Sequence, residues 1–191
     1  MQQFMADLVM HEVGHCLGLR HNFAGSTLLT VAEMLNDGKV REIGLSSSVM
    51  DYTPVNTPAV LRGDGVFFNA APGPYDRWAI EYGYTTTGAK SPEHEIAQLG
   101  LIAMRSGEPG HTYLTDEDAD GINPLAVRFD LGSNTIEWIK TEIKEHESVR
   151  KYAVSGLTKA GEGYGVRTRL ILSSYRRTAQ AAMMATRFVG G

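Results

Sequence analysis

The residues from His11 to His21 constrain this chain more than any other feature. They read His-Glu-Val-Gly-His-Cys-Leu-Gly-Leu-Arg-His. Residues four apart lie one above the other on an α-helix, so His11 and His15 can offer imidazole nitrogens to a single ion. Apolar residues recur at helical spacing around them. The pattern therefore predicts a helix over residues 2–19 that carries two ligands of a metal site.

The third histidine, His21, can reach the same ion only if the helix ends before it. Gly18 is the expected end, because glycine enters the left-handed conformation without a steric penalty and lets the chain turn back. Three neutral imidazoles leave one tetrahedral position of Zn²⁺ open for water, which is typical of a catalytic site. We therefore expect zinc bound by His11, His15 and His21.

Glu12 is the candidate general base. It lies about 100° around the helix from His11, beside the ligands rather than among them. From there it can take a proton from the attacking water and deliver it to a leaving amine. The alternative is that Glu12 and the histidines are ordinary polar residues on an exposed helix face.

Composition excludes several classes of protein. The 191 residues are 42% hydrophobic and 21% charged, with a net charge of −4, so no basic surplus points to a nucleic-acid partner. A single cysteine excludes an internal disulfide framework. No apolar run reaches the length of a membrane span, and the first residues lack the features of a signal peptide.

The remaining segments predict mostly helices. Beyond the first helix we expect them over residues 28–39, 74–83, 91–107, 134–154 and 166–188. Residues 63–69 are expected to form a short strand. The expected fold class is mainly α with little β, divided into residues 1–70, which carry the chemistry, and a helical region over residues 71–191.

Two motifs resemble those of a known family. HEVGHCLGLRH resembles the HExxHxxGxxH motif of the metzincins, and residues 48–52, Ser-Val-Met-Asp-Tyr, resemble their Met-turn. The resemblance implies that Met50 forms an apolar floor beneath the three histidines. It also implies that Tyr52 ligates zinc or stabilises an oxyanion. The alternatives are a core methionine and a tyrosine that merely packs by the turn. Asn22, after the third histidine, matches none of the best-known subfamilies.

A closer resemblance is to large bacterial zinc-dependent metalloproteases, formerly of unknown function, in which HEVGH, LGLRHNF, SSVMDY and GPYDRWAIEYGY recur in this order. It implies a peptide or protein substrate and a secreted, periplasmic or cell-envelope location. It also implies that this chain is the C-terminal subdomain of a longer enzyme, followed by a helical array and lacking the N-terminal portion. Such a piece is expected to bind metal weakly and to cleave poorly.

The acidic segment near residue 118 is a second candidate metal site. Asp116, Asp118 and Asp120 precede Gly121, as in the opening of a calcium loop, but the twelfth position is Val127 rather than glutamate. We therefore expect a solvated acidic loop, with Ca²⁺ binding as the alternative.

Three functions fit the sequence. The leading one is a zinc endopeptidase. The others are a non-catalytic helical scaffold or binding module with a structural or vestigial metal site, and a zinc hydrolase that acts on non-peptide amides.

Overall fold

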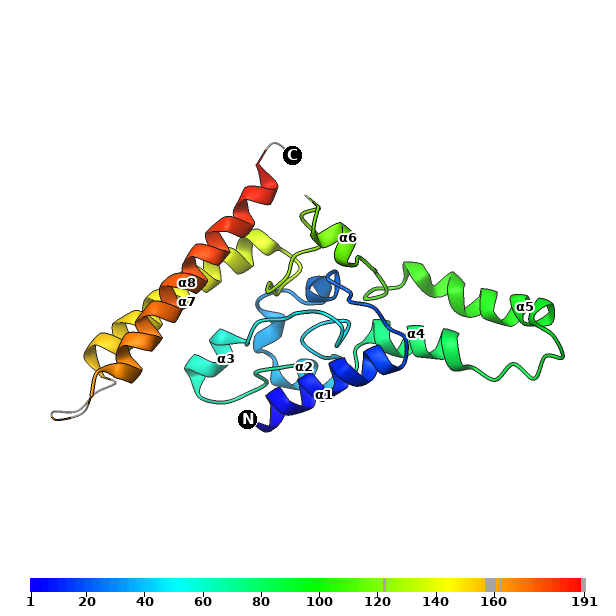
Figure 1. The fold of residues 1–191 in the computed structure, drawn as a ribbon, viewed down its shortest axis with the longest axis horizontal. Helices are drawn as coiled ribbons and strands as arrows, with labels where there is room; N and C mark the ends of the chain where they lie inside the picture. Colours follow the sequence, from blue (N-terminus) through cyan, green and yellow to red (C-terminus); the bar gives the residue numbers. More distant parts are fainter. Residues whose placement is uncertain (122, 157–160, 162, 190–191) are drawn as a thin grey trace. The chain divides into compact units, whose positions relative to one another are not determined.

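The computed structural model describes residues 1–121, 123–156, 161 and 163–189, and this part of the chain contains helices and no strand (Figure 1). The expected mainly α fold is confirmed. The α-helices are α1 (Gln2–Cys16), α2 (Asp37–Ile43), α3 (Thr57–Arg62), α4 (Pro74–Tyr84), α5 (Pro92–Ala103), α6 (Asp116–Ala119), α7 (Thr135–Ser155) and α8 (Gly165–Ala185). Short 3₁₀ helices are η1 (Gly25–Leu28), η2 (Glu33–Leu35), η3 (Met104–Gly107) and η4 (Thr186–Phe188).

The chain forms two compact units, residues 1–133 and residues 134–191. The candidate site lies entirely in the first unit. The sequence predicts a different division, at residue 70, which stays a prediction.

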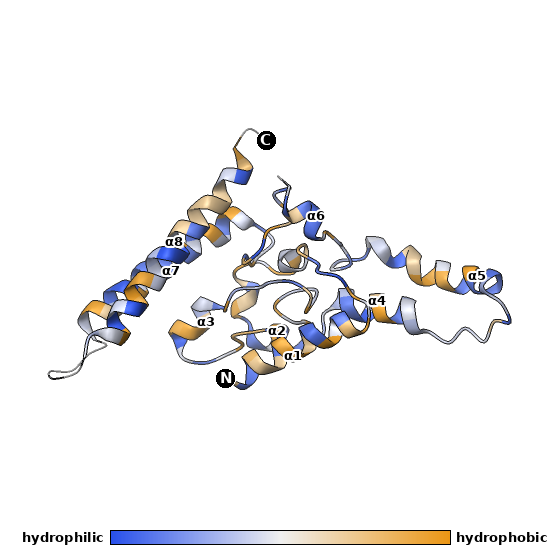
Figure 2. Ribbon diagram, viewed as in Figure 1, coloured by the Kyte–Doolittle hydropathy of each residue, from blue (hydrophilic) through white to orange (hydrophobic). Residues whose placement is uncertain are grey.

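The core of the first unit is built largely from irregular chain. Residues 44–51, here called the Met50 loop, are all buried. By contrast, α1 buries only Gly14, although its ribbon carries apolar stretches along its length (Figure 2). The fully buried large apolar residues of this unit are Phe23, Leu29, Met34, Leu45, Met50, Val66 and Leu131. The unit is therefore held by loops wrapped around a small apolar centre more than by helix packing.

Two local expectations were wrong. Residues 28–39 do not form one helix, because the Asn36 side chain accepts a hydrogen bond from the Lys39 N–H (3.2 Å) and starts α2 as its N-cap. Residues 63–69 do not form a strand. Gly63 and Gly65 adopt φ of +84° and +108°, which interrupts an extended chain, and the Phe67 N–H donates to the Gln3 side chain instead (2.7 Å).

The second unit is a pair of long helices, α7 and α8, which pack along each other. Asn134 caps α7 by accepting from the Glu137 N–H (3.0 Å), and asparagine is a preferred residue at this position. Arg150 of α7 donates to the hydroxyls of Ser174 and Thr178 on α8, each at 2.9 Å. None of the described helices in either unit combines the length and apolar character that a bilayer span requires.

Candidate metal centre

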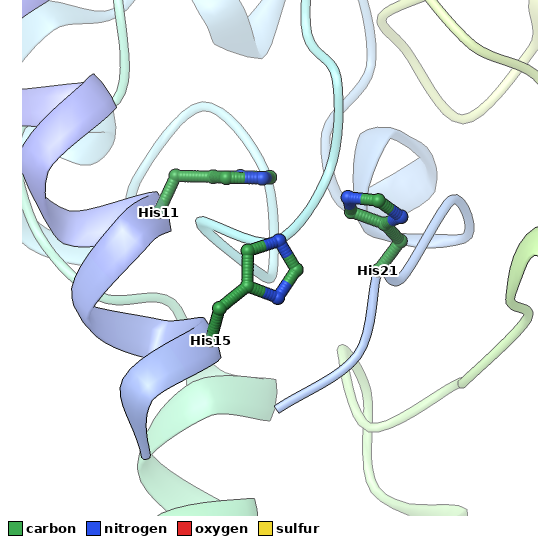
Figure 3. Close-up of side chains that lie close together, drawn as sticks. All are labelled: His11, His15 and His21. Carbon is green, nitrogen blue, oxygen red and sulfur yellow. The ribbon is translucent and has the colours of Figure 1, made fainter. Parts of the chain in front are cut away.

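The three histidines converge on one point (Figure 3). His11 and His15 project from α1, which ends at Cys16, and His21 approaches from the chain that follows. Gly18 adopts φ of +85°, and the Leu19 N–H returns to the Gly14 carbonyl at 3.0 Å. The chain therefore reverses at Gly18, which brings His21 back beside the helix.

The distances suit a single small cation. One nitrogen from each of His11, His15 and His21 lies within 4.8 Å of the others, and no other such group of His, Cys, Asp or Glu exists among the described residues. Ring centroids are 4.8 Å apart for His11 and His15, 4.9 Å for His15 and His21, and 5.4 Å for His11 and His21.

Hydrogen bonds fix the tautomer of each ring. His11 Nδ1 faces the Val49 carbonyl at 2.7 Å, and His15 Nδ1 faces the Leu19 carbonyl at 3.0 Å. His21 Nδ1 faces an Asp116 carboxylate oxygen at 3.0 Å. Because these oxygens only accept, each Nδ1 carries the proton and donates it, so each Nε2 keeps an unprotonated lone pair that a metal can bind. Burial also lowers the pKa of His11, which favours the neutral ring that a metal requires. The donor set therefore fits a divalent cation such as zinc.

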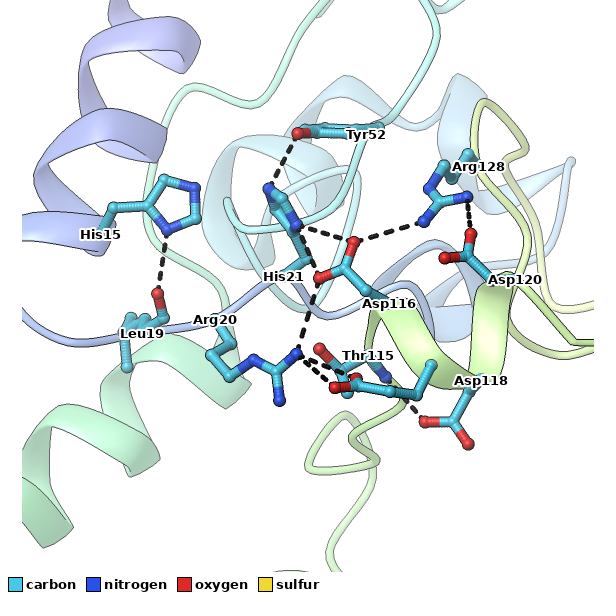
Figure 4. Close-up of polar contacts among 11 residues, drawn as sticks. His15, Leu19, Arg20, His21, Tyr52, Thr115, Asp116, Asp118, Asp120 and Arg128 are labelled. Carbon is cyan, nitrogen blue, oxygen red and sulfur yellow. Dashed lines mark hydrogen bonds and ion pairs between the residues drawn. The ribbon is translucent and has the colours of Figure 1, made fainter.

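Asp116 orients His21 from a segment far away in the sequence. Its carboxylate accepts from His21 and from Arg128 (3.2 Å), which also pairs with Asp120 (Figure 4). Burial opposes ionisation of Asp116, but the hydrogen bonds from His21 and Arg128 prevail and lower its pKa. A carboxylate behind a metal-binding histidine is a recurrent arrangement that fixes the ring and raises its basicity.

The structure does not support calcium binding by the acidic segment. Asp116 faces His21, Asp118 caps α6 by accepting from the Thr115 N–H (2.9 Å), and Asp120 pairs with Arg128 (2.7 Å). The three carboxylates that the sequence suggests as calcium ligands therefore bind three separate protein groups and do not face a common point. The expectation of a solvated loop is also wrong for Asp116, which belongs to the candidate metal centre.

Tyr52 and Glu12 lie next to the histidines. The Tyr52 hydroxyl lies 2.8 Å from His21 Nε2, and it donates because Nδ1 carries the ring proton. Glu12 is exposed on α1. His11, Glu12 and Tyr52 together line one cavity of about 190 Å³. A substrate in that cavity would meet all three side chains.

Met50 packs directly beneath α1. It is fully buried, and a Cβ added at Gly14 would overlap its sulfur. Gly14 lies between His11 and His15 in the sequence, so the methionine lies under the turn that carries both ligands. The motif therefore has glycine at this position because the close packing of Met50 leaves no room for a side chain.

Asp76 holds the Met50 loop, a role that none of the sequence motifs predicts. This buried carboxylate on α4 accepts from the Ser48 hydroxyl (2.6 Å), the Val49 N–H (2.9 Å) and the Gly73 N–H (2.8 Å). Burial raises its pKa although these hydrogen bonds oppose the shift. Its position near the start of a helix that opens with proline was the available signal, since an acidic residue there often caps the helix.

Asn22 also connects distant segments. It is fully buried, its amide donates to the Thr112 carbonyl (3.0 Å), and its oxygen accepts from the Leu114 N–H (3.1 Å). Its own N–H donates to the Met50 carbonyl at 3.1 Å. The residue after the third histidine therefore fixes the backbone that presents His21.

A family model described as Met-zincin matches residues 1–191. The chain belongs to this family. At the level of class this makes it a metzincin-like peptidase, for which zinc is the implied metal. Comparison with curated proteins and with solved structures returned no match.

Proposed function

We propose that the chain carries the catalytic centre of a zinc endopeptidase, with His11, His15 and His21 as the metal ligands. Two observations carry this proposal: one nitrogen of each of the three rings lies within 4.8 Å of the others, and each Nδ1 has an oxygen acceptor. Zinc held there would act as a Lewis acid that activates water and polarises the scissile carbonyl.

Glu12 is the general base in this proposal. It accepts the proton of the attacking water and delivers it to the nitrogen of the leaving amine. Its place in the cavity that His11 and Tyr52 also line supports this role. Its exposure leaves the carboxylate free to face a substrate rather than a protein partner.

Tyr52 assists by hydrogen bonding to the developing oxyanion. Its hydroxyl donates to His21 Nε2 here (2.8 Å); zinc bound to that nitrogen would release the hydroxyl, which then lies close enough to donate to a substrate oxygen. Met50 and Gly18 are structural in the proposal. Met50 forms the floor under α1, and Gly18 makes the reversal that returns His21 to the site.

The test combines zinc analysis with hydrolysis of a quenched fluorescent peptide library. Glu12→Gln should retain the zinc content of the unaltered chain while its rate of hydrolysis falls by about a hundredfold or more. Glu42→Gln is the matched control, because Glu42 is exposed on α2 and does not line the cavity. Hydrolysis that survives Glu12→Gln would refute Glu12 as the base, whereas a zinc-loaded chain with no hydrolysis would favour a structural metal site.

A further inference from the structure

The cavity beside the metal centre extends along α1 away from the histidines. Besides His11, Glu12 and Tyr52, it is lined by Asp7, one helical turn before His11. Its volume of about 190 Å³ far exceeds the space of about 30 Å³ that one water takes in the liquid. A peptide whose scissile bond lies at the histidines would therefore place a neighbouring side chain here.

The ionisable side chains that line this cavity are mostly acidic. Asp7, Glu12 and Asp51 contribute carboxylates, and no Lys or Arg lines it. Asp51 is buried and accepts from the Ser26 N–H (2.6 Å), which turns one of its oxygens inward to the protein. Glu12 is assigned to the proton transfer. Asp7 is thus the carboxylate available to a ligand.

Asp7 is half-buried without a compensating charge. Among the described residues, none forms a hydrogen bond or ion pair with its carboxylate. Burial raises the pKa of Asp7 to about 7, which reflects how poorly the cavity solvates a lone negative charge. A cation placed beside Asp7 would offset that cost.

The walls of the cavity suit a long, partly apolar side chain. Phe4, Leu8 and Phe129 line it. Phe4 is held by an edge contact with Phe68, at 5.4 Å between ring centroids. Apolar walls can pack on the methylene groups of lysine or arginine while the charged end meets a carboxylate, and aromatic faces also attract cations.

Resting on the proposed peptidase function, the geometry points to this cavity as the subsite for a basic side chain of the substrate, with Asp7 as the specificity-determining residue. A lysine or arginine near the scissile bond lays its stem against Phe4, Leu8 and Phe129 and pairs its charge with Asp7. Neutral polar and acidic side chains leave the carboxylate unpaired and are disfavoured.

Peptide binding to the zinc-loaded Glu12→Gln variant tests the subsite without any need for hydrolysis. Each short alanine-rich peptide carries one arginine, and the set places this arginine at every position in turn. Fluorescence anisotropy compares their binding with that of the same peptides carrying citrulline, which has nearly the same shape as arginine but no charge. At the position that enters the cavity, arginine should bind about tenfold more tightly than citrulline, as expected for one partly buried charge pair.

Adding Asp7→Asn should abolish this preference, and Asp7→Ser serves as a second variant if the first does not fold. Asp64→Asn is the matched control, because the Asp64 side chain is 80% exposed and does not line the cavity. Equal binding of arginine and citrulline at every position, or a preference that survives both Asp7 variants, would overturn the subsite. A preference that depends on Asp7 in a chain that hydrolyses nothing would support the subsite and refute the peptidase.

Discussion

Helix α1 and the Met50 loop contact each other at the candidate site and are stabilised in different ways. The helix supplies His11, His15 and Glu12 but buries only Gly14. The loop over residues 44–51 is buried throughout. Backbone hydrogen bonds from neighbouring segments hold the loop together with buried side chains. Among these side chains are Asp76 and Asn69, whose oxygen accepts from the Leu45 N–H at 2.9 Å.

This contrast explains how each element holds its side chains in position at the site. A helix orients two ligands through its own periodicity, so it needs few tertiary contacts. An irregular loop has no such internal order, and each of its buried backbone groups needs a specific partner. We therefore expect the loop to be sensitive to single polar substitutions and the helix to be sensitive mainly at Gly14.

Asp76→Ala should be the most damaging substitution. Removal of the carboxylate leaves the Ser48 hydroxyl and the N–H groups of Val49 and Gly73 buried without their acceptor, which should lower the free energy of unfolding by about 3–4 kcal/mol. Denaturant unfolding measures this change. Asp64→Ala, at an exposed site, should cost less than about 1 kcal/mol. Similar losses in the two variants would show that Asp76 does not hold the Met50 loop.

Gly14→Ala should lower the free energy of unfolding by about 1–3 kcal/mol, because the added methyl group overlaps the Met50 sulfur and overpacks the contact between α1 and the Met50 loop. Gly100→Ala in α5 is the control, since open space surrounds Gly100 and alanine favours a helix by about 1 kcal/mol. Thermal unfolding of the two variants should therefore shift in opposite directions. Stabilisation by both would show that α1 does not rest on Met50.

Much of the helical part was predictable from local sequence, and the loop was not. The prolines that open α4 and α5 and the asparagine cap at Asn134 are signals within a few residues of the helix they begin. The partner of His21 could not be found in this way, because Asp116 lies 95 residues further along the chain. The acidic segment was visible, but nothing in it indicates that one carboxylate faces a histidine.

Asp116→Asn should weaken zinc binding by about 10- to 100-fold, because the amide replaces the charged acceptor behind His21. Competition with a chromophoric chelator measures the affinity. Asp120→Asn is the control, since Asp120 shares the partner Arg128 but touches no histidine of the site. If the two variants bind zinc equally well, Asp116 is only a structural residue.

Asp7→Asn should have the mildest effect, and this effect depends on pH. Burial raises the pKa of Asp7 from 3.8 to about 7, so the folded chain holds a proton that the unfolded chain releases. The stability that this proton confers is present below about pH 4 and is lost as the pH rises towards 7. Asp7→Asn should therefore raise the melting temperature at pH 8 but change it little at pH 4. An equal shift at both pH values would contradict the buried, unpaired carboxylate.

X-ray absorption at the zinc edge of the loaded chain probes the three-imidazole centre itself. Three imidazole nitrogens at about 2.0–2.1 Å, with no sulfur at about 2.3 Å, are the result expected for His11, His15 and His21. His21→Ala should reduce the imidazole count to two. A sulfur ligand from the exposed Cys16, or an unaltered spectrum in His21→Ala, would contradict a centre built from these three rings.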